Sequence, residues 1–509
     1  MRSRTTFSPF RPRLAFNLMN ARIIMAAAGV LLFLPSSPAW AADYYVSPSG
    51  SDSQSGSSSS PWRTIQHAAD SVRAGDVVTV LAGTYSESVI FHISGSSESP
   101  IQFAAEGGKE VVVRGTFELA RDASHIYVTG FILRDFDGWG VFLRGGNADI
   151  VLSSLQISGG DCGVRLTYGY SGEDPLEGPV SNVTLKDSLV KDALYTGVDG
   201  TPGPCRGLDF INLEVMGCGL SLGSDYGADG IAVERGEDIL VEGCAVHDNA
   251  GDGIDLNSRD RAGFVRGIVV RRNRVFRNRL NGIKLWSGGT IENNLVWGQG
   301  NTAVDIGAHP GIYRLANNTV AYNMWDPSFS VRSYSLAAAY PDDSSGVSAG
   351  VDLTLVNNIF AFNTGPQVGS PTGIYLGPGV RLRKEGWNIF WSRGNGEIQA
   401  EFVTGDSWFS RSRISGGEWR LASGRGEDDL CSDPMFYSGW PDCDLRLQSS
   451  SPGIDGGTAE ETPAVDIDCM ARPAGGGPDM GAHEMNSERD PQCAPGTQAT
   501  KTKRIFRPR

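Results

Sequence analysis

Closely spaced cysteine and histidine ligands are missing from this sequence. Its 509 residues include six histidines, each standing alone, and eight cysteines with no C-x-x-C pair. Transition-metal centres such as zinc sites are built from closely spaced Cys and His ligands, so we expect no such centre here. Runs rich in Ala, Leu, Glu and Lys are also scarce, which argues against a helical fold.

Positive charge is in short supply as well. The chain has 44 Lys and Arg against 58 Asp and Glu, which gives a formal net charge of -14. Five of the arginines lie in residues 1–41, which contain no acid, so the remaining chain is more acidic still. Duplex nucleic acid and anionic membranes attract basic surfaces, so we expect neither as a partner.

The sequence has no apolar run near its N-terminus that is long enough to span a membrane. Residues 23–34 form a run of 12 apolar or small residues, which follows the five arginines and precedes Ala39-Trp40-Ala41. This order is typical of a cleavable export signal, so we predict a signal peptide over 1–41 and no membrane span in the mature chain, with an uncleaved anchor as the alternative. The protein is then secreted, either extracellular, at the cell surface or periplasmic. All eight cysteines follow this segment, which fits an oxidising compartment with disulfides of undefined pairing.

A repeated pattern dominates what the sequence does contain. Glycine (66 residues), Val, Ile, Thr and Asn recur throughout, and short apolar triplets return from about Asp43 to Trp419, which predicts an all-β protein. Four copies of one pattern start 23, 29 and 21 residues apart, the spacing of solenoid turns. We therefore predict a right-handed parallel β-helix of one long body, and a monomer. The four copies are Asp229-Gly-Ile-Ala-Val233, Asp252-Gly-Ile-Asp-Leu256, Asn281-Gly-Ile-Lys-Leu285 and Thr302-Ala-Val-Asp-Ile306.

Each copy places one variable residue between two apolar ones. Because side chains alternate along a strand, the apolar pair points inward and the variable residue outward. If consecutive copies pair as parallel strands, the variable residues lie about 4.8 Å apart in one exposed column. That column contains Ala232, Asp255, Lys284 and Asp305, and Asp229, Asp252 and Asn281 form a second column beside it.

Both ends of the predicted solenoid have sequences of their own. Residues 61–69 predict a short amphipathic helix that caps the N-terminal end, and recurrent Asn-Asn pairs mark turns where equivalent asparagines hydrogen-bond between rungs. The phrase Tyr44-Tyr-Val-Ser-Pro48 resembles the opening of secreted parallel β-helix proteins. Ser451-Pro-Gly-Ile-Asp455 and Asp479-Met-Gly-Ala-His-Glu484 resemble the ending of choice-of-anchor Q β-helix proteins. We expect the β-helix at 42–425, an associated C-terminal segment at 426–485 and a disordered tail at 486–509.

Acidic residues gather around one lysine in the central repeats. Asp229, Asp252 and Asp255 come from adjacent turns and converge on one side of Lys284. A cluster of carboxylates without His or Cys favours Ca²⁺ over softer metals. The alternatives are that the Asp-Gly pairs are ordinary turns, and that Asp255, Lys284 and Asp305 are an ion ladder that stabilises the sheet.

The same residues carry a family resemblance. Asp229-Gly-Ile, Asp252-Gly-Ile-Asp255-Leu and Gly282-Ile-Lys284-Leu resemble the DG, DDGWDL and GFKLGG signature of polysaccharide lyase family 9, which comprises secreted calcium-dependent pectate lyases. The resemblance implies Ca²⁺ on Asp229, Asp252 and Asp255, with Lys284 as the Brønsted base in β-elimination of an acidic polysaccharide such as pectate. The sequence departs from this signature at Gly251, where the family has Asp.

Other residues near this cluster are candidates for substrate contacts. Arg259, Arg277 and Arg279 could hold uronate carboxylates, and Trp286 could stack on a sugar ring, or each could be plain surface. A non-catalytic glycan-binding β-helix and a uronate C5-epimerase or alginate lyase remain as alternatives. A glycoside hydrolase is disfavoured, because a lysine occupies the centre of the column and the Gly-His-Gly and Arg-Ile-Lys phrases of polygalacturonases are absent.

Overall fold

The computed structural model describes residues 41–167, 178–201, 203–221, 228–257, 265–323, 334–339, 350–363, 373–391, 397–401, 408–491 and 493. Every described residue belongs to the compact unit Ala41–Arg509. Residues 1–40 of the predicted export signal therefore lie outside the described part. No helix within the described residues is long and apolar enough to cross a membrane.

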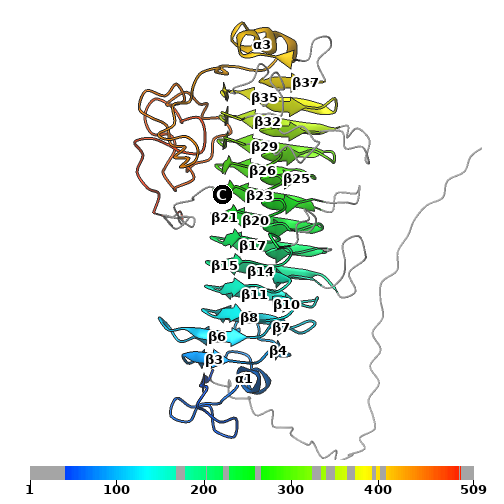
Figure 1. Cartoon of the computed structure of the whole chain (residues 1–509), viewed down its shortest axis with the longest axis vertical. Helices are drawn as coiled ribbons and strands as arrows, with labels where there is room; N and C mark the ends of the chain where they lie inside the picture. The colour runs from blue at the N-terminus through cyan, green and yellow to red at the C-terminus, as the bar shows by residue number, and fades with distance from the viewer. Residues whose placement is uncertain are drawn as a thin grey trace, which may run out of the picture. The chain divides into compact units, whose positions relative to one another are not determined.

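Short strands stack in three parallel sheets, and each complete turn of the chain contributes one strand to each sheet (Figure 1). The first sheet contains β1 (Asp43–Val46), β2 (Val77–Val80), β5 (Ile101–Ala105), β8 (Ser124–Thr129), β11 (Ala148–Ser153), β14 (Val180–Lys186), β17 (Cys205–Ile211), β20 (Gly236–Glu242), β23 (Val265–Arg271), β26 (Gly289–Glu292), β29 (Gly311–Ala316), β32 (Val351–Val356) and β35 (Val380–Gly386). The second sheet contains β3 (Gly83–Tyr85), β6 (Val111–Arg114), β9 (Ile132–Arg134), β12 (Gln156–Ser158), β15 (Leu189–Lys191), β18 (Glu214–Met216), β21 (Ala245–His247), β24 (Arg274–Phe276), β27 (Leu295–Trp297), β30 (Thr319–Ala321), β33 (Ile359–Ala361) and β36 (Ile389–Trp391). The third sheet contains β4 (Val89–Phe91), β7 (Phe117–Leu119), β10 (Trp139–Leu143), β13 (Cys162–Arg165), β16 (Val198–Asp199), β19 (Ile231–Ala232), β22 (Ile254–Leu256), β25 (Ile283–Leu285), β28 (Val304–Ile306), β31 (Leu336–Ala338), β34 (Ile374–Leu376), β37 (Ile398–Ala400) and β38 (Trp408–Phe409).

The strand order confirms the predicted right-handed parallel β-helix. From β2 to β37, neighbours in each sheet are three strands apart along the chain, so each of these rungs consists of one strand from each sheet. The last strand, β38, is different because it runs antiparallel to β37. Strand pairing therefore changes direction where the solenoid ends.

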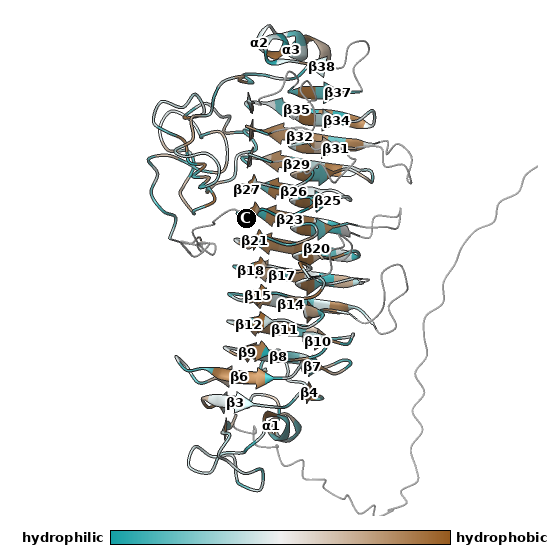
Figure 2. Cartoon of the chain, in the orientation of Figure 1, coloured by the Kyte–Doolittle hydropathy of each residue, from teal (hydrophilic) through white to brown (hydrophobic). Residues whose placement is uncertain are grey.

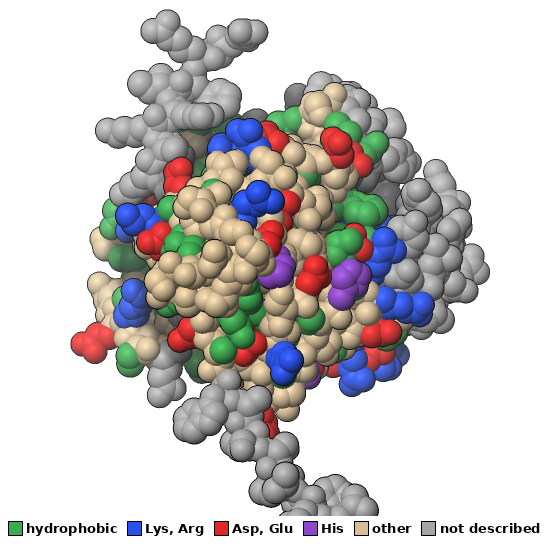
Figure 3. Space-filling model, turned by 90° about the horizontal axis from the view of Figure 1, so that it is seen from below, with side chains coloured by type: hydrophobic (Ala, Val, Ile, Leu, Met, Phe, Trp, Pro, Cys, Tyr) green, Lys and Arg blue, Asp and Glu red, His purple; other side chains and the backbone are tan. Residues whose placement is uncertain are grey.

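Helices lie at both ends of the solenoid. Helix α1 (Ile65–Ser71) begins after Thr64, whose hydroxyl accepts a hydrogen bond from the His67 amide at 3.2 Å, an N-cap that satisfies one free donor of the first turn. It confirms the capping helix predicted at 61–69. Helices α2 (Arg411–Ser415) and α3 (Glu418–Ser423) lie at the opposite end (Figure 2). Viewed from the α1 end, charged side chains of both signs are scattered over the face in view (Figure 3).

The interior of the solenoid is apolar, as the repeat predicts. Hydrophobic residues occur in the strands of every turn (Figure 2), and Ile254, Leu256, Ile283 and Leu285 have no exposed surface. The predicted asparagine ladder is also present at the turn between the first and second sheets. Side-chain amide contacts of 3.0, 3.0, 3.0 and 3.2 Å link Asn273, Asn294, Asn318, Asn358 and Asn388 in that order.

The C-terminal residues pack against the second sheet rather than adding turns. Phe436, Leu447 and Met480 form an apolar cluster with Leu295 and Ile359 from that sheet. Polar contacts join the same surfaces, since Asn293 Nδ2 donates to the Val465 carbonyl at 2.7 Å and Asn317 Nδ2 to the Asp479 carbonyl at 3.0 Å. This segment therefore covers the outer face of the second sheet over its last turns.

The cysteines form fewer disulfides than the sequence suggests. Cys469 and Cys493 are bonded, and the other six are free thiols, all within the described part of the chain. Cys205, Cys218 and Cys244 are at most 2% exposed. They fill the apolar interior as small hydrophobic residues, so these cysteines serve packing rather than cross-linking.

Candidate active site

The predicted outer column lies on the third sheet in the expected register. Asp255 in β22 pairs with Lys284 in β25, and Lys284 pairs with Asp305 in β28. Ala232 of β19 precedes them in the same column. The inward-pointing Ile and Leu on either side fix this register, because a slip of one residue would turn the apolar pairs outward.

The second column forms a hydrogen-bonded stack where the chain enters these strands. The Asp252 amide donates to Asp229 Oδ1 at 2.7 Å, and the Asn281 amide donates to Asp252 Oδ1 at 2.7 Å. Asn281 Nδ2 reaches the same Asp252 oxygen at 2.9 Å. Each acidic side chain is therefore held by the backbone of the following turn, and Asp252 Oδ2 is left to face the first column.

Lys284 is the residue at which the two columns meet. Its Nζ lies 3.3 Å from Asp252 Oδ2 and 3.2 Å from Asp255 Oδ2. It also lies 4.5 Å from the centre of the Trp286 ring. The sequence predicts these side chains on an exposed face, but the Lys284 side chain is only 15% exposed and Asp255 is 8% exposed. The residues shield one another, so the cluster is more buried than a bare sheet face.

Three carboxylates of the cluster are close enough to share a cation. Asp229, Asp252 and Asp255 each offer an oxygen within 4.8 Å of the others. One oxygen of Asp255 accepts a 3.0 Å hydrogen bond from Asn257 Nδ2, while its Oδ1 is buried without any hydrogen-bond partner in the described part of the chain. A buried carboxylate oxygen without a partner is costly unless a ligand satisfies it. This donor set of hard oxygens fits Ca²⁺.

Crowding and burial shift the pKa values of the acids and of the lysine in the cluster. Burial, together with repulsion from Asp252 and Asp255, raises the pKa of Asp229 well above its usual range. Burial also raises the pKa of Asp255 to about 7, although the nearby Lys284 ammonium opposes this. For Lys284, burial acts to lower the pKa, but the carboxylates of Asp255, Asp252, Asp229 and Asp305 outweigh it and raise the pKa. The site therefore holds its lysine protonated and favours protons or a cation on its acids.

Steric crowding explains why position 251 holds a glycine where the pectate lyase signature has an aspartate. A Cβ atom added at this position would lie 2.4 Å from Asp229 Oδ1 and 2.8 Å from the Ala228 carbonyl carbon. The Gly251 amide is also hydrogen-bonded to the Ala228 carbonyl at 2.9 Å, which fixes the backbone there. An aspartate at 251 would displace Asp229, so it does not simply add a fourth carboxylate to this cluster.

The predicted substrate-binding residues are not all near the lysine. Trp286 contacts it directly, whereas Arg277 pairs with Asp248 at 2.7 Å and lies 4.6 Å from the Phe276 ring on the second sheet. Arg279 is exposed in the segment between β24 and β25. Arg259 lies outside the described residues.

Asn257 is a member of the cluster that sequence reasoning missed. Its amide holds Asp255 Oδ2, and its own Oδ1 is buried without a partner within the described part of the chain. The sequence feature that could have identified Asn257 is its position two residues after Asp255. Residues two apart on a strand share a face, so Asn257 follows Asp255 on the outer side.

Comparisons with known proteins agree with this architecture. Residues 139–320 match the family described as the right handed beta helix region, and residues 48–91 match a protein family of unknown function, DUF1565. The uncharacterized protein YwoF of Bacillus subtilis is 25% identical over 348 residues, which cover 55% of this chain and 74% of that protein.

Two pectate lyases are also similar. Pectate lyase PEL9 of Emericella nidulans is 26% identical over 288 residues, covering 54% of this chain and 62% of that protein. The chain thus spans about three fifths of this relative. The crystal structure of pectate lyase Pel9A matches 87% of this chain and 96% of its own, with a TM-score of 0.41 and 17% identity.

Proposed function

We propose that this pectate-lyase-like parallel β-helix protein is a secreted polysaccharide lyase that cleaves an acidic polysaccharide such as pectate, with Lys284 as the base. The observation that carries the proposal is the contact of Lys284 Nζ with two of three clustered carboxylates on one side of the solenoid. β-Elimination from a uronate needs a base and a cation that neutralises the sugar carboxylate, and an amine beside clustered acids can provide the base and the cation site.

Asp229, Asp252 and Asp255 are the residues that would hold calcium. When bound there, calcium would neutralise part of the charge of these acids and of the uronate carboxylate, which lowers the pKa of Lys284 and acidifies the C5–H bond of the sugar. Asn257 and the Asn281 side chain orient Asp255 and Asp252, so that their remaining oxygens face the same space.

Lys284 would act by removing the C5 proton. The neutral amine takes this proton, the electrons of the C5–H bond form the C4–C5 double bond, and the oxygen at C4 leaves with its electron pair and is protonated by solvent. Only the unprotonated amine can do this, and the surrounding acids hold the proton on it. Turnover should therefore rise with pH over the range in which Lys284 loses its proton.

A structural role for the same residues is the second candidate. The contacts of Lys284 with Asp252 and Asp255 are also those of an ion ladder, which would stabilise the sheet without any turnover. A C5-epimerase would use the same proton abstraction and return the proton to the opposite face.

The experiment is a lyase assay on polygalacturonate and alginate with calcium or with a chelator. The mature protein should generate ultraviolet-absorbing unsaturated uronate ends on one of these polymers, and only with calcium. Lys284→Ala should reduce the rate by at least about a thousandfold, of the order expected when the general base is removed.

The alternatives give other outcomes. Inversion at C5 without unsaturated ends would identify an epimerase. If no uronate polymer is altered and Lys284→Ala only lowers the unfolding temperature, the ion ladder is the role of the cluster.

A further inference from the structure

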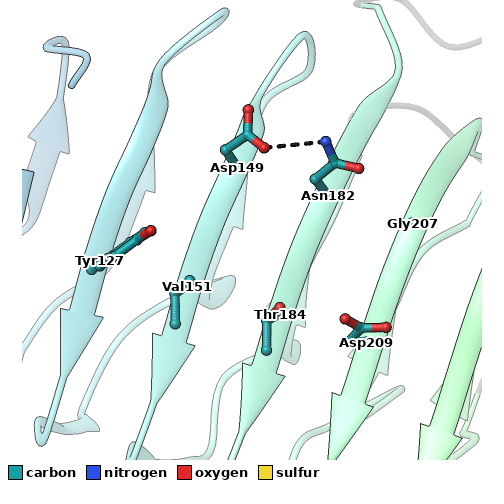
Figure 4. Close-up of a pocket in the computed structure, with 7 residues that line it drawn as sticks. All are labelled: Tyr127, Asp149, Val151, Asn182, Thr184, Gly207 and Asp209. Carbon is teal, nitrogen blue, oxygen red and sulfur yellow. Dashed lines mark hydrogen bonds between the residues drawn. The ribbon is translucent and has the colours of Figure 1, made fainter. Parts of the chain in front are cut away.

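A shallow groove lies on the outer face of the first sheet, away from the lysine cluster on the third. It has a volume of about 300 Å³, and its base is one outward column in which Tyr127 pairs with Val151, Val151 with Thr184 and Thr184 with Asp209 (Figure 4). Three strand spacings of about 4.8 Å give this column a length of about 14 Å. That length fits a short oligosaccharide.

A row of left-handed residues forms one side of the groove. Asp149 and Asn182 have φ angles of 57° and 52°, and Asn182 Nδ2 donates to Asp149 Oδ1 at 3.1 Å (Figure 4). The row continues with Gly207, whose φ is 62° and where an added Cβ would lie 2.7 Å from Asn182 Oδ1. Gly207 has no side chain, so the side wall is low next to Asp209, and the row continues beyond it with Asp238, whose φ is 55°.

The groove combines an aromatic face with polar groups that have no protein partner. Tyr127 is one of the large hydrophobic side chains that remain exposed, at 37%. Within the described residues, the Tyr127 hydroxyl, the Thr184 hydroxyl and the Asp209 carboxylate make no hydrogen bond to protein. An aromatic ring packs on the C–H face of a sugar, and carboxylates and hydroxyls bind its hydroxyl groups.

The charge of the groove selects between kinds of sugar. Asp149 and Asp209 are its acidic lining residues, none of the residues that line it is Lys or Arg, and the His125 ring nitrogen Nε2 lies 3.6 Å from Asp149 Oδ2. A uronate would meet two carboxylates and no lysine or arginine among the residues that line the groove, so the groove disfavours acidic glycans. A neutral sugar supplies hydroxyl donors for both acids.

We propose that this groove binds a neutral oligosaccharide, with Tyr127 as the stacking platform and Asp209 and Thr184 as hydrogen-bonding groups. The groove and the lysine cluster lie on different sheets, so this proposal does not depend on the lyase proposal. Together, the two sites would hold the protein on a neutral polysaccharide while it acts on an acidic one.

The test is calorimetric titration of the mature protein with hexasaccharides of β-linked glucose, xylose, mannose and galactose, and with hexagalacturonate, all in chelator. At least one neutral hexasaccharide should bind. Tyr127→Ala should weaken that binding about tenfold or more, as expected for loss of an aromatic anchor, and Asp209→Asn should also weaken it. The Tyr127 side chain points outward, so its removal leaves no cavity.

Two controls make the result specific. Tyr195→Ala removes an equally exposed tyrosine (41%) elsewhere and should change the affinity less than about twofold. Lys284→Ala should bind the neutral sugar as the unaltered protein does, whatever its lyase activity. The proposal is overturned if none of the four neutral hexasaccharides binds, if Tyr127→Ala binds them equally well, or if hexagalacturonate is the ligand that Tyr127→Ala loses.

Discussion

At the scale of single residues, a substitution of Lys284 can distinguish a catalytic role from a role in sheet stabilisation. Arginine keeps the positive charge and can still pair with Asp252 and Asp255, but it does not lose its proton in the working pH range. We therefore expect Lys284→Arg to unfold within a few degrees of the unaltered protein and to retain less than about one hundredth of the turnover rate. Thermal unfolding and the lyase assay measure the two effects. Turnover at the normal rate in this variant would remove Lys284 as the base.

Gly251 provides a second test at this scale. An aspartate there resembles the pectate lyase signature, but its Cβ would lie 2.4 Å from Asp229 Oδ1. Gly251→Asp should therefore weaken calcium binding and lower stability by about 1–3 kcal/mol, the usual cost of overpacking. Calorimetry with calcium and denaturant unfolding give both values. Tighter calcium binding in this variant would show that Asp229 can move aside.

Asp255 links stability to pH and calcium. Its pKa is raised to about 7 in the folded protein, against about 3.9 for an unfolded aspartate, so between these values the folded state binds a proton that the unfolded state releases. This residue therefore contributes a loss of stability as pH rises from about 4 to about 7 in chelator. At pH 7.5, calcium at about 100 times its Kd should raise the free energy of unfolding by about 2.7 kcal/mol. At pH 5 the increase should be smaller, because protons compete with calcium for the carboxylates.

The matched variant for that measurement is Asp255→Asn. Its unfolding temperature should respond to calcium much less at both pH values, because one of the three carboxylates is gone. An equal calcium response in Asp255→Asn would place the ion elsewhere, and magnesium serves as the control for general ionic effects.

At the scale of elements, the asparagine ladder between the first and second sheets is a buried polar support of the fold. Asn318 is 2% exposed, and its side chain donates to Ile291 O at 2.8 Å while its Oδ1 accepts from the Asn294 amide at 3.0 Å. Asn318→Ala leaves these buried groups without partners, at about 1–3 kcal/mol for each group. Denaturant unfolding should show the loss, and Gln102→Ala, on an exposed strand position, should change stability by less than about 0.5 kcal/mol.

The elements also show what the sequence could reveal and what it could not. The repeat fixed the pairing of Asp255, Lys284 and Asp305, because alternation and rung spacing are local properties of the chain. It could not reveal that Arg277 pairs with Asp248 on the second sheet, because the direction of the chain at a turn depends on backbone angles. The burial of Lys284 was also hidden, since it results from packing against Trp286 and the acids rather than from its own strand pattern.

At the scale of the whole molecule, one disulfide holds the C-terminal segment that covers the second sheet. Cys469 and Cys493 close a loop with a sequence separation of 24, which corresponds to about 3 kcal/mol in the chain-entropy account. The double variant Cys469→Ser, Cys493→Ser should expose residues 465–491 to faster hydrogen exchange, while β22, β25 and β28 keep their protection. Alkylation of the denatured protein without reductant should modify six cysteines and leave two. Modification of fewer than six would indicate further disulfides.

The spacing of the central turns has a consequence for how such a protein changes over time. Copies of the repeat begin 23, 29 and 21 residues apart, yet the register from Asp255 to Asp305 is unbroken. Length differences are therefore absorbed entirely between the strands. Insertions and deletions in the connections can therefore reshape what surrounds the cluster, while strand pairing keeps the spacing of its charges.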